Sequence, residues 1–359
     1  MIDTSEKKLK LLHVVRRYGP VGGMERYAWE LTRELRDLGH EVEVLCEERF
    51  TEKPDGIAVY ELGRIAMRPR WLSQLRFGKR VERWLENNPH SGWLIHSHER
   101  LNSHHITTFH GPPFAVVRGM PWWRKVSLRV AMRMYLERRE LTVARCIVPN
   151  SNIISNSLAH YYPELAHKLT RPIVPGVAPG RPREARSVPS DGGVIGFVGK
   201  EWQRKGLAIA VEIVAVLRGT RPNLRFCVIG PAASEVQHLF ADWQGGYQLL
   251  GWSDQSHYAD FDVLLHPAKA EPYGMVISEA MAARVPVVIS DVCGAADQVT
   301  PTAGTVLPLS APIEAWAVAI EQQLYRTEPV PQYEHSWREV ALEYEVIYRR
   351  QMLPDTDDF

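Results

Sequence analysis

The stretch HPAKAEPYGMVISEAMAARVP, from His266 to Pro286, decides how the second half of the chain folds. It begins at the end of a short apolar run, DVLLH, which predicts a buried strand. Tyr273 and Gly274 predict a turn, and the residues that follow predict a helix over about 275–283. A strand that leads through a loop into a helix is typical of open α/β sheets, which bind ligands beside the carboxyl ends of their strands.

Two carboxylates flank this turn, Glu271 in the loop and Glu279 inside the helix. A carboxylate accepts two hydroxyls at once, which suits the vicinal diols of sugars. The unpaired amides of the first helical turn, at Gly274, Met275 and Val276, carry the positive end of the helix dipole and suit a phosphate or diphosphate. For this segment alone, an ordinary strand–loop–helix whose glutamates face water is an equal alternative.

A second segment, IGFVGKEWQRKGL over 195–207, favours a ligand site. It predicts an apolar strand that ends at Gly199, with Lys200, Arg204 and Lys205 in the next turn. Cations just beyond a strand's carboxyl edge lie where such sheets bind ligands, and lysine acts there as a point charge on phosphate. A single basic turn, taken alone, is usually solvated surface.

Together the two segments resemble the donor-binding half of glycosyltransferase family 4, whose members are retaining enzymes of the GT-B fold. The family's E-x7-E pattern is matched by Glu271 and Glu279. Its VG-(R/K)-…-KG pattern is matched by Gly199, Lys200, Lys205 and Gly206. Lys200 stands where arginine is usual, its gap to Lys205 is one residue shorter than common, and Asp297 replaces a glutamate in a later segment.

The resemblance extends to the N-terminal half. A strand over 9–15 is followed by a diglycine loop at Gly22 and Gly23, a helix and the GHEV lead into a second strand. ITTFHGPP, VPNSNIISNSL and IVPGV then follow in the family's order, the last without the family's asparagine. ITTFHGPP places His110 where the family has a histidine beside the donor sugar.

The resemblance implies an α/β, GT-B architecture of two Rossmann-like domains, each a doubly wound parallel sheet, facing across a cleft. The alternation of β-like and helical runs along the chain agrees with two such sheets. We expect an acceptor-binding domain over 1–175, completed by a C-terminal helix over 335–353, and a donor-binding domain over 176–334. The Pro- and Gly-rich stretch 171–193 contains the predicted linker.

The resemblance also implies roles for the matched residues. Lys200 and Lys205 stabilise the diphosphate, Glu271 holds donor-sugar hydroxyls, Glu279 holds the ribose, and His110 is a hydrogen-bond partner beside the donor sugar. The implied catalytic residues are His110, Glu271 and Lys205. The implied donor-binding residues are Gly22, Gly23, Lys200, Arg204, Lys205, Tyr273, Gly274, Met275, Val276 and Glu279.

Composition is that of an ordinary soluble protein, with 45% hydrophobic and 24% charged residues in 359. No apolar run reaches the roughly 18 residues of a transmembrane helix. The N-terminal residues have no signal-peptide pattern, and four scattered cysteines without metal-ligand spacing predict reduced, mostly buried thiols. We therefore expect a cytoplasmic protein.

The net charge of +1 conceals an asymmetry between the two halves. Residues 1–180 hold 28 basic against 19 acidic residues, and residues 181–359 hold 15 against 23. The basic excess lies in 64–83, with seven basic residues and one acid, and in 118–145, with eight basic residues and two acids. Nucleic acid is disfavoured as a partner because no binding motif occurs and the other half is acidic.

The second basic stretch combines cations with tryptophan. Trp122 and Trp123 adjoin Arg124, Lys125 and Arg129, a combination that predicts docking on an anionic membrane surface or binding of an anionic acceptor. A core helix with a charged outer face is the alternative. We expect peripheral association with the inner face of the cytoplasmic membrane.

Other motifs carry less weight. Asp260-x-Asp262 and Asp355-x-Asp357 match the DxD of metal-dependent glycosyltransferases, but the first opens a buried-looking strand and the second is terminal. Five histidines could suggest zinc, yet they lack ligand spacing on one helix: His96, His98, His104, His105 and His110. There is no GxGxxG or GxSxG motif. We predict no metal and no other cofactor.

The predicted function is retaining transfer of a hexose from a nucleoside-diphosphate sugar, with a UDP-sugar favoured. The acceptor is a glycolipid or oligosaccharide of the bacterial envelope, such as lipopolysaccharide core. Two alternatives stay open: a GDP-mannose-dependent mannosyltransferase for exopolysaccharide or O-antigen, and a non-catalytic nucleotide-sugar-binding protein.

Overall fold

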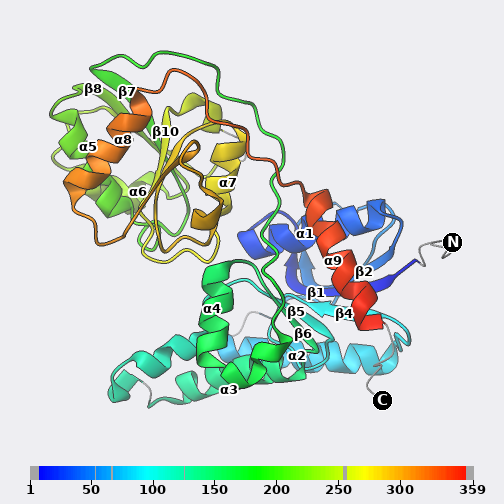
Figure 1. Ribbon diagram of the computed structural model, residues 1–359. Coiled ribbons are helices and arrows are strands. Elements are labelled where there is room, and N and C mark those ends of the chain that lie inside the picture. The colour runs from blue at the N-terminus through cyan, green and yellow to red at the C-terminus, as the bar shows by residue number, and fades with distance from the viewer. Residues whose placement is uncertain (1–7, 53, 66–67, 125, 254–256, 353–359) are drawn as a thin grey trace. The chain divides into compact units, whose positions relative to one another are not determined.

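The structure, a computed structural model, describes residues 8–52, 54–65, 68–124, 126–253 and 257–352. It divides into two compact units (Figure 1). The first unit comprises the chain up to Gly176 together with the residues from Ser336 onward, and the second comprises Val177–His335.

The first unit is built on a six-stranded parallel sheet in the order β3-β2-β1-β4-β5-β6. Its strands are β1 (Lys10–Tyr18), β2 (Glu41–Arg49), β3 (Ala58–Glu61), β4 (Leu94–Ser97), β5 (Ile106–Phe109) and β6 (Cys146–Pro149). The central strand β1 is buried on both faces because five consecutive residues, 11–15, are almost solvent-free. Burial on both faces explains why these strands read as continuous apolar runs.

Helices cover both faces of this sheet (Figure 1). They are α1 (Gly23–Asp37), α2 (Arg70–Asn87), α3 (Leu128–Val143), α4 (Asn152–Tyr161) and α9 (Trp337–Met352). Three 3₁₀ turns join them: η1 (Phe114–Gly119), η2 (Trp122–Arg124) and η3 (Pro163–Lys168). Phe77 and Val81 of α2 pack under Leu12 and Val14 on one face. On the other face α9 packs against α1, where Tyr344 accepts a hydrogen bond from Tyr27 at 3.1 Å.

The second unit repeats the plan with the strand order β12-β11-β10-β7-β8-β9, again all parallel. Its strands are β7 (Gly192–Val198), β8 (Asn223–Ile229), β9 (Tyr247–Gly251), β10 (Val263–His266), β11 (Val287–Ser290) and β12 (Gly304–Leu307). Its helices are α5 (Leu207–Arg218), α6 (Ala233–Val236), η4 (Gln237–Phe240), η5 (Tyr258–Asp260), α7 (Met275–Ala282), η6 (Gly294–Gln298) and α8 (Ile313–Leu324). Figure 1 shows α5 and α8 on one face of this sheet and α7 on the other.

The predicted fold class is confirmed, because both units are α/β with parallel six-stranded sheets. The predicted strands over 9–15, up to Gly199 and at DVLLH are present as β1, β7 and β10, whereas the short edge strands β3 and β12 have no such signal in the sequence. The final helix was predicted from 335 and begins at Trp337. The four cysteines are buried and free, as expected.

The basic stretch 118–145 is not one continuous amphipathic helix. Two 3₁₀ turns precede α3, which begins only at Leu128, where Ser127 caps it by accepting from the Val130 amide. Across the described part of the chain, no helix combines the length and apolarity needed to span a bilayer.

Candidate functional site

Two glycines bring the β7–α5 turn against the loop after β10. Gly199 has φ +156°, and a Cβ there would lie 2.0 Å from Cδ of Lys205. Gly206 has φ +79°, and a Cβ there would lie 2.0 Å from the carbonyl oxygen of Pro267. Only glycine tolerates such a close backbone approach at positive φ. The sequence K-G therefore sets Lys205 directly beside the loop that carries Glu271.

Glu271 is the centre of a buried ion cluster. Its Oε2 lies 2.9 Å from Nζ of Lys205, and its Oε1 lies 3.3 Å from a guanidinium nitrogen of Arg204. Nε2 of His266, the last residue of β10, lies 3.4 Å from Oε2. Only 7% of Glu271 is exposed. Two cations from the β7–α5 turn and one imidazole from the end of β10 thus contact the same carboxylate.

The cluster keeps this carboxylate ionised. Burial alone would raise the pKa of Glu271, but the His266 hydrogen bond and the positive charges of Lys205 and Arg204 outweigh it, so the pKa falls well below its ordinary value. Burial lowers the pKa of His266, so this ring is neutral and donates to the carboxylate through Nε2. The arrangement offers an anion for hydroxyl donors beside two cations for an anionic ligand.

The second carboxylate lies in a different environment on α7. Glu279 is half-buried, and its Oε2 accepts a hydrogen bond from the Tyr258 hydroxyl at 2.6 Å. The helix begins after Gly274, which has φ +98° and supplies no side-chain cap for the first amides. Met275 and Val276 are half-buried at this end, and the buried Tyr273 hydroxyl is within 2.8 Å of the Ser278 hydroxyl.

Lys200 is separated from the other two cations. Its Nζ lies over the exposed ring of Trp252, 4.6 Å from the centroid, in a cation–π contact. The structure therefore brings Arg204, Lys205 and Glu271 together and directs Lys200 elsewhere.

In the first unit, the diglycine loop leads into α1. Gly22 is the N-cap and has no side chain to bond the first amides, and a Cβ on Gly23 would meet nothing within 4 Å. Space is therefore open at Gly23, whereas the buried carboxylate of Glu25, which pairs with Arg17, fills the space beside Gly22.

His110 follows β5 and belongs to a chain of imidazoles. Its Nε2 lies 3.0 Å from Nδ1 of His98, and Nε2 of His98 lies 3.2 Å from Nδ1 of His13 on β1. Burial lowers the pKa of both His110 and His13 to about 3. Burial, followed by the charges of neighbouring imidazoles, also holds the pKa of His98 well below its ordinary value. All three rings are neutral at physiological pH.

The histidines group differently from the five noted in the sequence. His13, His96 and His98 have ring nitrogens within 4.8 Å of one another, a spacing that could hold a metal ion. However, His96 already bonds the Tyr348 hydroxyl through Nδ1 and the Thr108 hydroxyl through Nε2, each at 2.7 Å. A metal would have to displace these hydrogen bonds.

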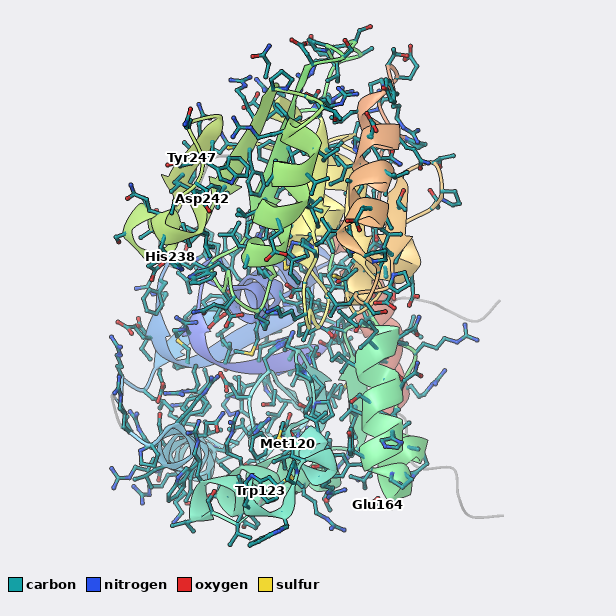
Figure 2. The ribbon with its side chains drawn as sticks, turned by 90° about the vertical axis from the view of Figure 1, so that its left-hand side faces the viewer. Met120, Trp123, Glu164, His238, Asp242 and Tyr247 are labelled. Atoms are coloured by element: carbon teal, nitrogen blue, oxygen red, sulfur yellow. The ribbon has the colours of Figure 1, made fainter. Side chains whose placement is uncertain are left out.

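The tryptophans of the basic stretch are on the surface rather than in a core. Trp122 is 70% exposed, Trp123 64%, Val126 74% and Leu128 68%. Figure 2 shows Met120 and Trp123 at the periphery of the first unit. Arg129 is exposed as well, whereas Lys125 and the side chain of Arg124 lie outside the described residues.

The two acids of this stretch, by contrast, are buried. Glu137 accepts from Arg100 at 2.7 Å and from the backbone amides of Phe114 and Ala115. Glu140 accepts from the Thr107 hydroxyl at 2.8 Å, and burial raises its pKa to about 8. The outward face of the stretch is therefore more basic than its composition indicates.

The aspartates of the internal DxD sequence are engaged by arginines. Asp262 is buried and pairs with Arg183 and Arg186 at 3.1 and 2.8 Å, and it also accepts from the Val194 amide. Asp260 pairs with Arg181. Asp355 and Asp357 lie outside the described residues.

Sequence reasoning missed three residues of the site. His266 ends the DVLLH strand, and its place before the Glu271 loop could have identified it. Tyr258 and Trp252 reach Glu279 and Lys200 from segments with no motif of their own.

Two family models match the chain. The model of glycosyltransferase family 4 matches residues 21–181, and the model of group 1 glycosyl transferases matches residues 192–325. With two parallel-sheet units and these matches, the protein is a glycosyltransferase of the GT-B fold. It belongs to glycosyltransferase family 4.

Individual relatives agree with this assignment. The chain is 31% identical over 163 residues to a GDP-mannose-dependent alpha-mannosyltransferase of Mycolicibacterium smegmatis, a match that covers 44% of this chain and only 42% of that protein. It is 25% identical over 360 residues to a D-inositol 3-phosphate glycosyltransferase of Thermobispora bispora, covering 85% and 82%.

Solved structures share the fold. The crystal structure of WaaG, a glycosyltransferase involved in lipopolysaccharide biosynthesis, superposes with a TM-score of 0.76 at 17% identity, covering 97% of this chain and 96% of WaaG. Anabaena HepE in complex with UDP and glucose has a TM-score of 0.61 at 16% identity, covering 96% and 95%.

Proposed function

We propose that the chain transfers a hexose from a nucleoside-diphosphate sugar, preferably a UDP-sugar, to an envelope saccharide with retention of configuration. The cluster of Arg204, Lys205 and Glu271 carries this proposal, because it sets two cations beside a hydroxyl-accepting carboxylate. As the diphosphate leaves, the anomeric carbon becomes cationic, so the phosphates need positive charge and the sugar needs fixed orientation.

Each part of the cluster has a task in this reaction. The bond from the anomeric carbon to the phosphate oxygen breaks, the acceptor oxygen bonds to the same face, and its proton moves to the leaving phosphate. Lys205 and Arg204, with the uncapped amides of α7, neutralise that phosphate, so transfer needs no divalent metal. Glu271 orients the sugar hydroxyls and Glu279 the ribose hydroxyls.

The acceptor we propose is a saccharide or glycolipid that bears phosphate. A cavity of about 610 Å³ in the first unit lies at the ends of β1 and β2 and the starts of α1 and α2. Exposed arginines line it at Arg64, Arg68 and Arg70, while Arg16 bonds Glu47 and Ser73 at 2.7 Å each. Glutamates line the same cavity at Glu25, Glu47, Glu48 and Glu99. The cavity therefore offers cations to a phosphate and carboxylates to the hydroxyls of its carrier. Relatives named for inositol 3-phosphate and phosphatidyl-myo-inositol support the same class.

An anionic bilayer is the proposed docking partner. Four exposed apolar side chains, at 122, 123, 126 and 128, adjoin the exposed Arg129 on a segment whose acids are buried. Apolar side chains inserted at the headgroups and cations facing them are the two contributions that hold peripheral proteins on membranes.

The donor is tested with a panel of UDP-, GDP- and ADP-sugars, because a ligand of the folded state raises the melting temperature. We expect UDP-sugars to stabilise the protein, and Lys205→Met to remove the shift. Lys269→Met, at an exposed lysine in the loop after β10 that carries Glu271, is the matched control. Stabilisation by GDP-mannose alone would favour the alternative mannosyltransferase, which the 31%-identical relative supports.

The chemistry is tested by product analysis. Transfer should survive chelators and give the same anomer as the donor. Loss of activity with a chelator that manganese restores, or an inverted product, would overturn the mechanism. Binding of a donor without transfer or hydrolysis would indicate a nucleotide-sugar-binding protein.

The acceptor site and the membrane surface have separate tests. Arg70→Ser should raise the KM for a phosphorylated acceptor but not for its dephosphorylated form, whereas Arg83→Ser, on the same helix outside the cavity, should change neither. Replacing Arg124, Lys125 and Arg129 by Ser should abolish binding to anionic vesicles. Tyr325→Ala, at an aromatic residue as exposed as Trp122 and Trp123, should leave vesicle binding unchanged. Equal vesicle binding by parent and triple variant would refute the docking surface.

A further inference from the structure

The imidazole chain of the first unit determines which nitrogen of His110 carries the proton. The chain has two ring-to-ring hydrogen bonds, His13 to His98 at 3.2 Å and His98 to His110 at 3.0 Å. A neutral imidazole has one N–H and one bare nitrogen. His98 therefore donates in one of its bonds and accepts in the other, so both bonds run in the same direction.

The two possible directions differ in whether Nε2 of His13, at the end of the chain away from His110, carries a proton. If the N–H groups point toward His13, that residue carries its proton on Nε2. Nε2 of His13 is completely buried and has no hydrogen-bond partner among the described residues. A buried N–H without an acceptor is rare in proteins, because losing its hydrogen bond to water is not compensated. If the N–H groups point toward His110, the same position holds a bare nitrogen, which proteins leave unpaired more readily.

The second direction fixes every proton in the chain. Nδ1 of His13 donates to Nε2 of His98, and Nδ1 of His98 donates to Nε2 of His110. His110 then holds its own proton on Nδ1. Its Nε2 lone pair is occupied, so no bare nitrogen is left to accept a proton.

Neighbouring side chains hold the imidazole chain in place. His96 is bonded on both nitrogens, and its ring centroid lies 4.5 Å from that of His98. The Thr108 hydroxyl that bonds His96 also lies 2.6 Å from the Tyr344 hydroxyl on α9. Tyr27 of α1 contacts the edge of His110, with centroids 4.9 Å apart.

We propose that His13 and His98 are positioning residues that hold His110 as the Nδ1–H tautomer. His110 then acts as a fixed hydrogen-bond donor to an oxygen of the substrate and not as a base. This inference rests on the proposed function and on the expectation, taken from the family resemblance, that His110 lies beside the donor sugar. It adds His13 and His98 to the site, and both act only through His110.

The direct test is the tautomer itself, read from the imidazole nitrogen spectrum of the full chain labelled with ¹⁵N-histidine. His110 is assigned with a His110→Gln variant. We expect protonated Nδ1 and bare Nε2 for His110 in the parent. His98→Leu should move the proton toward Nε2. His98→Asn, whose amide can donate from the Nδ1 position, should keep the parent tautomer. His160→Leu, an exposed histidine on α4, is the control.

Kinetics separate this inference from the proposed function. His98→Leu should lower kcat about tenfold, as expected for one lost hydrogen bond, with the acceptor KM unchanged and much of the rate restored in His98→Asn. A proton on Nε2 in the parent, or an unchanged tautomer in a folded His98→Leu, overturns the inference whatever the activity. The expected tautomer in a protein without transferase activity leaves the inference intact and refutes the proposed function.

Discussion

The two buried polar clusters of this protein hold their functional groups in opposite charge states. In the second unit, Glu271 stays ionised because Lys205 and Arg204 are within 2.9 and 3.3 Å. In the first unit, His13, His98 and His110 stay neutral because burial lowers each pKa and no carboxylate pairs with them among the described contacts. The Glu271 cluster holds an ionised group, whereas the histidine chain holds only neutral groups.

The difference indicates what each cluster can contribute. Where cations flank a carboxylate, the carboxylate can accept a substrate hydroxyl and the cations can pair with a substrate phosphate, without leaving a bare buried charge. A neutral imidazole chain offers direction instead, because each proton fixes the next. Charge compensation therefore belongs to the leaving group, and orientation belongs to His110. The predictions below break or sharpen this division.

The largest effect is expected from removing the carboxylate. Glu271→Ala deletes the sugar contact and leaves the mostly buried Lys205 without its partner, so kcat should fall about 10²–10³-fold. Affinity for the free nucleoside diphosphate should change far less, because the proposed partner of Glu271 is the sugar. Glu201→Ala, which removes an exposed partner of the same Arg204, is the control. Nucleotide affinity that falls as far as kcat would refute the assigned role.

The next effect concerns the backbone that holds the charge cluster. Gly206→Ala adds a Cβ at positive φ, 2.0 Å from the Pro267 carbonyl oxygen, and should lower the free energy of unfolding by about 3 kcal/mol. Gly23→Ala, where a Cβ meets nothing within 4 Å, should not destabilise the protein. Urea denaturation of both variants gives the comparison, and equal midpoints would show that the loops can separate at little cost.

The sequence predicted the fold well because its strands are buried on both faces. The runs that became β1, β7 and β10 are continuous and apolar, and each is followed by a helical pattern. The edge strand β3 escaped prediction because its four residues are partly exposed and lack this signal. Edge strands have one neighbour, so sequence constrains them less.

The sequence indicates that two side chains lie close together only where each stands in a motif just after a strand. Lys205 and Gly206 lie in the turn after β7, and Glu271 lies in the loop after β10. Their proximity follows because β7 and β10 are parallel neighbours in the sheet. The histidine chain joins residues 13, 98 and 110, whose contact depends on the order of β1, β4 and β5. Periodicity does not specify which strands are neighbours, so His13 could not be identified.

Acid should affect His13 and Glu271 in separate pH ranges. The folded pKa of His13 is about 3 against 6.5 unfolded, so the unfolded state binds protons first and stability falls as pH drops below about 6.5. The folded pKa of Glu271 is also depressed, but its contribution is complete above its unfolded pKa, about 4.5, and is lost only below that value.

Between pH 7.5 and 5 Glu271 should not respond, whereas the buried histidines should, together with Glu99 and Glu140, whose pKa values burial raises to about 7 and 8. Only the difference between the parent and a His13 variant therefore isolates His13. The parent should lose about 2 kcal/mol through His13, and His13→Leu should flatten the slope by that amount. The ring faces His96, His98 and Tyr348, which are unchanged in the variant. Chemical denaturation at the two pH values measures the slopes, and His160→Leu should keep the parent's. Identical slopes for parent and His13→Leu would mean that His13 is protonated in the folded protein.

The smallest effect is expected at the second carboxylate. Glu279 is half-buried and accepts a hydrogen bond from the Tyr258 hydroxyl at 2.6 Å. Tyr258→Phe removes one charge-assisted hydrogen bond and should weaken binding of the free nucleoside diphosphate about fivefold, because Glu279 is no longer oriented toward the ribose. The kcat at saturating donor should stay near the parent value, and Tyr325→Phe, an exposed tyrosine of the same unit, should change neither quantity. Calorimetric titration with the nucleotide measures the affinity. Unchanged affinity in Tyr258→Phe, together with a lowered kcat, would assign Glu279 to the sugar and leave the ribose to other groups.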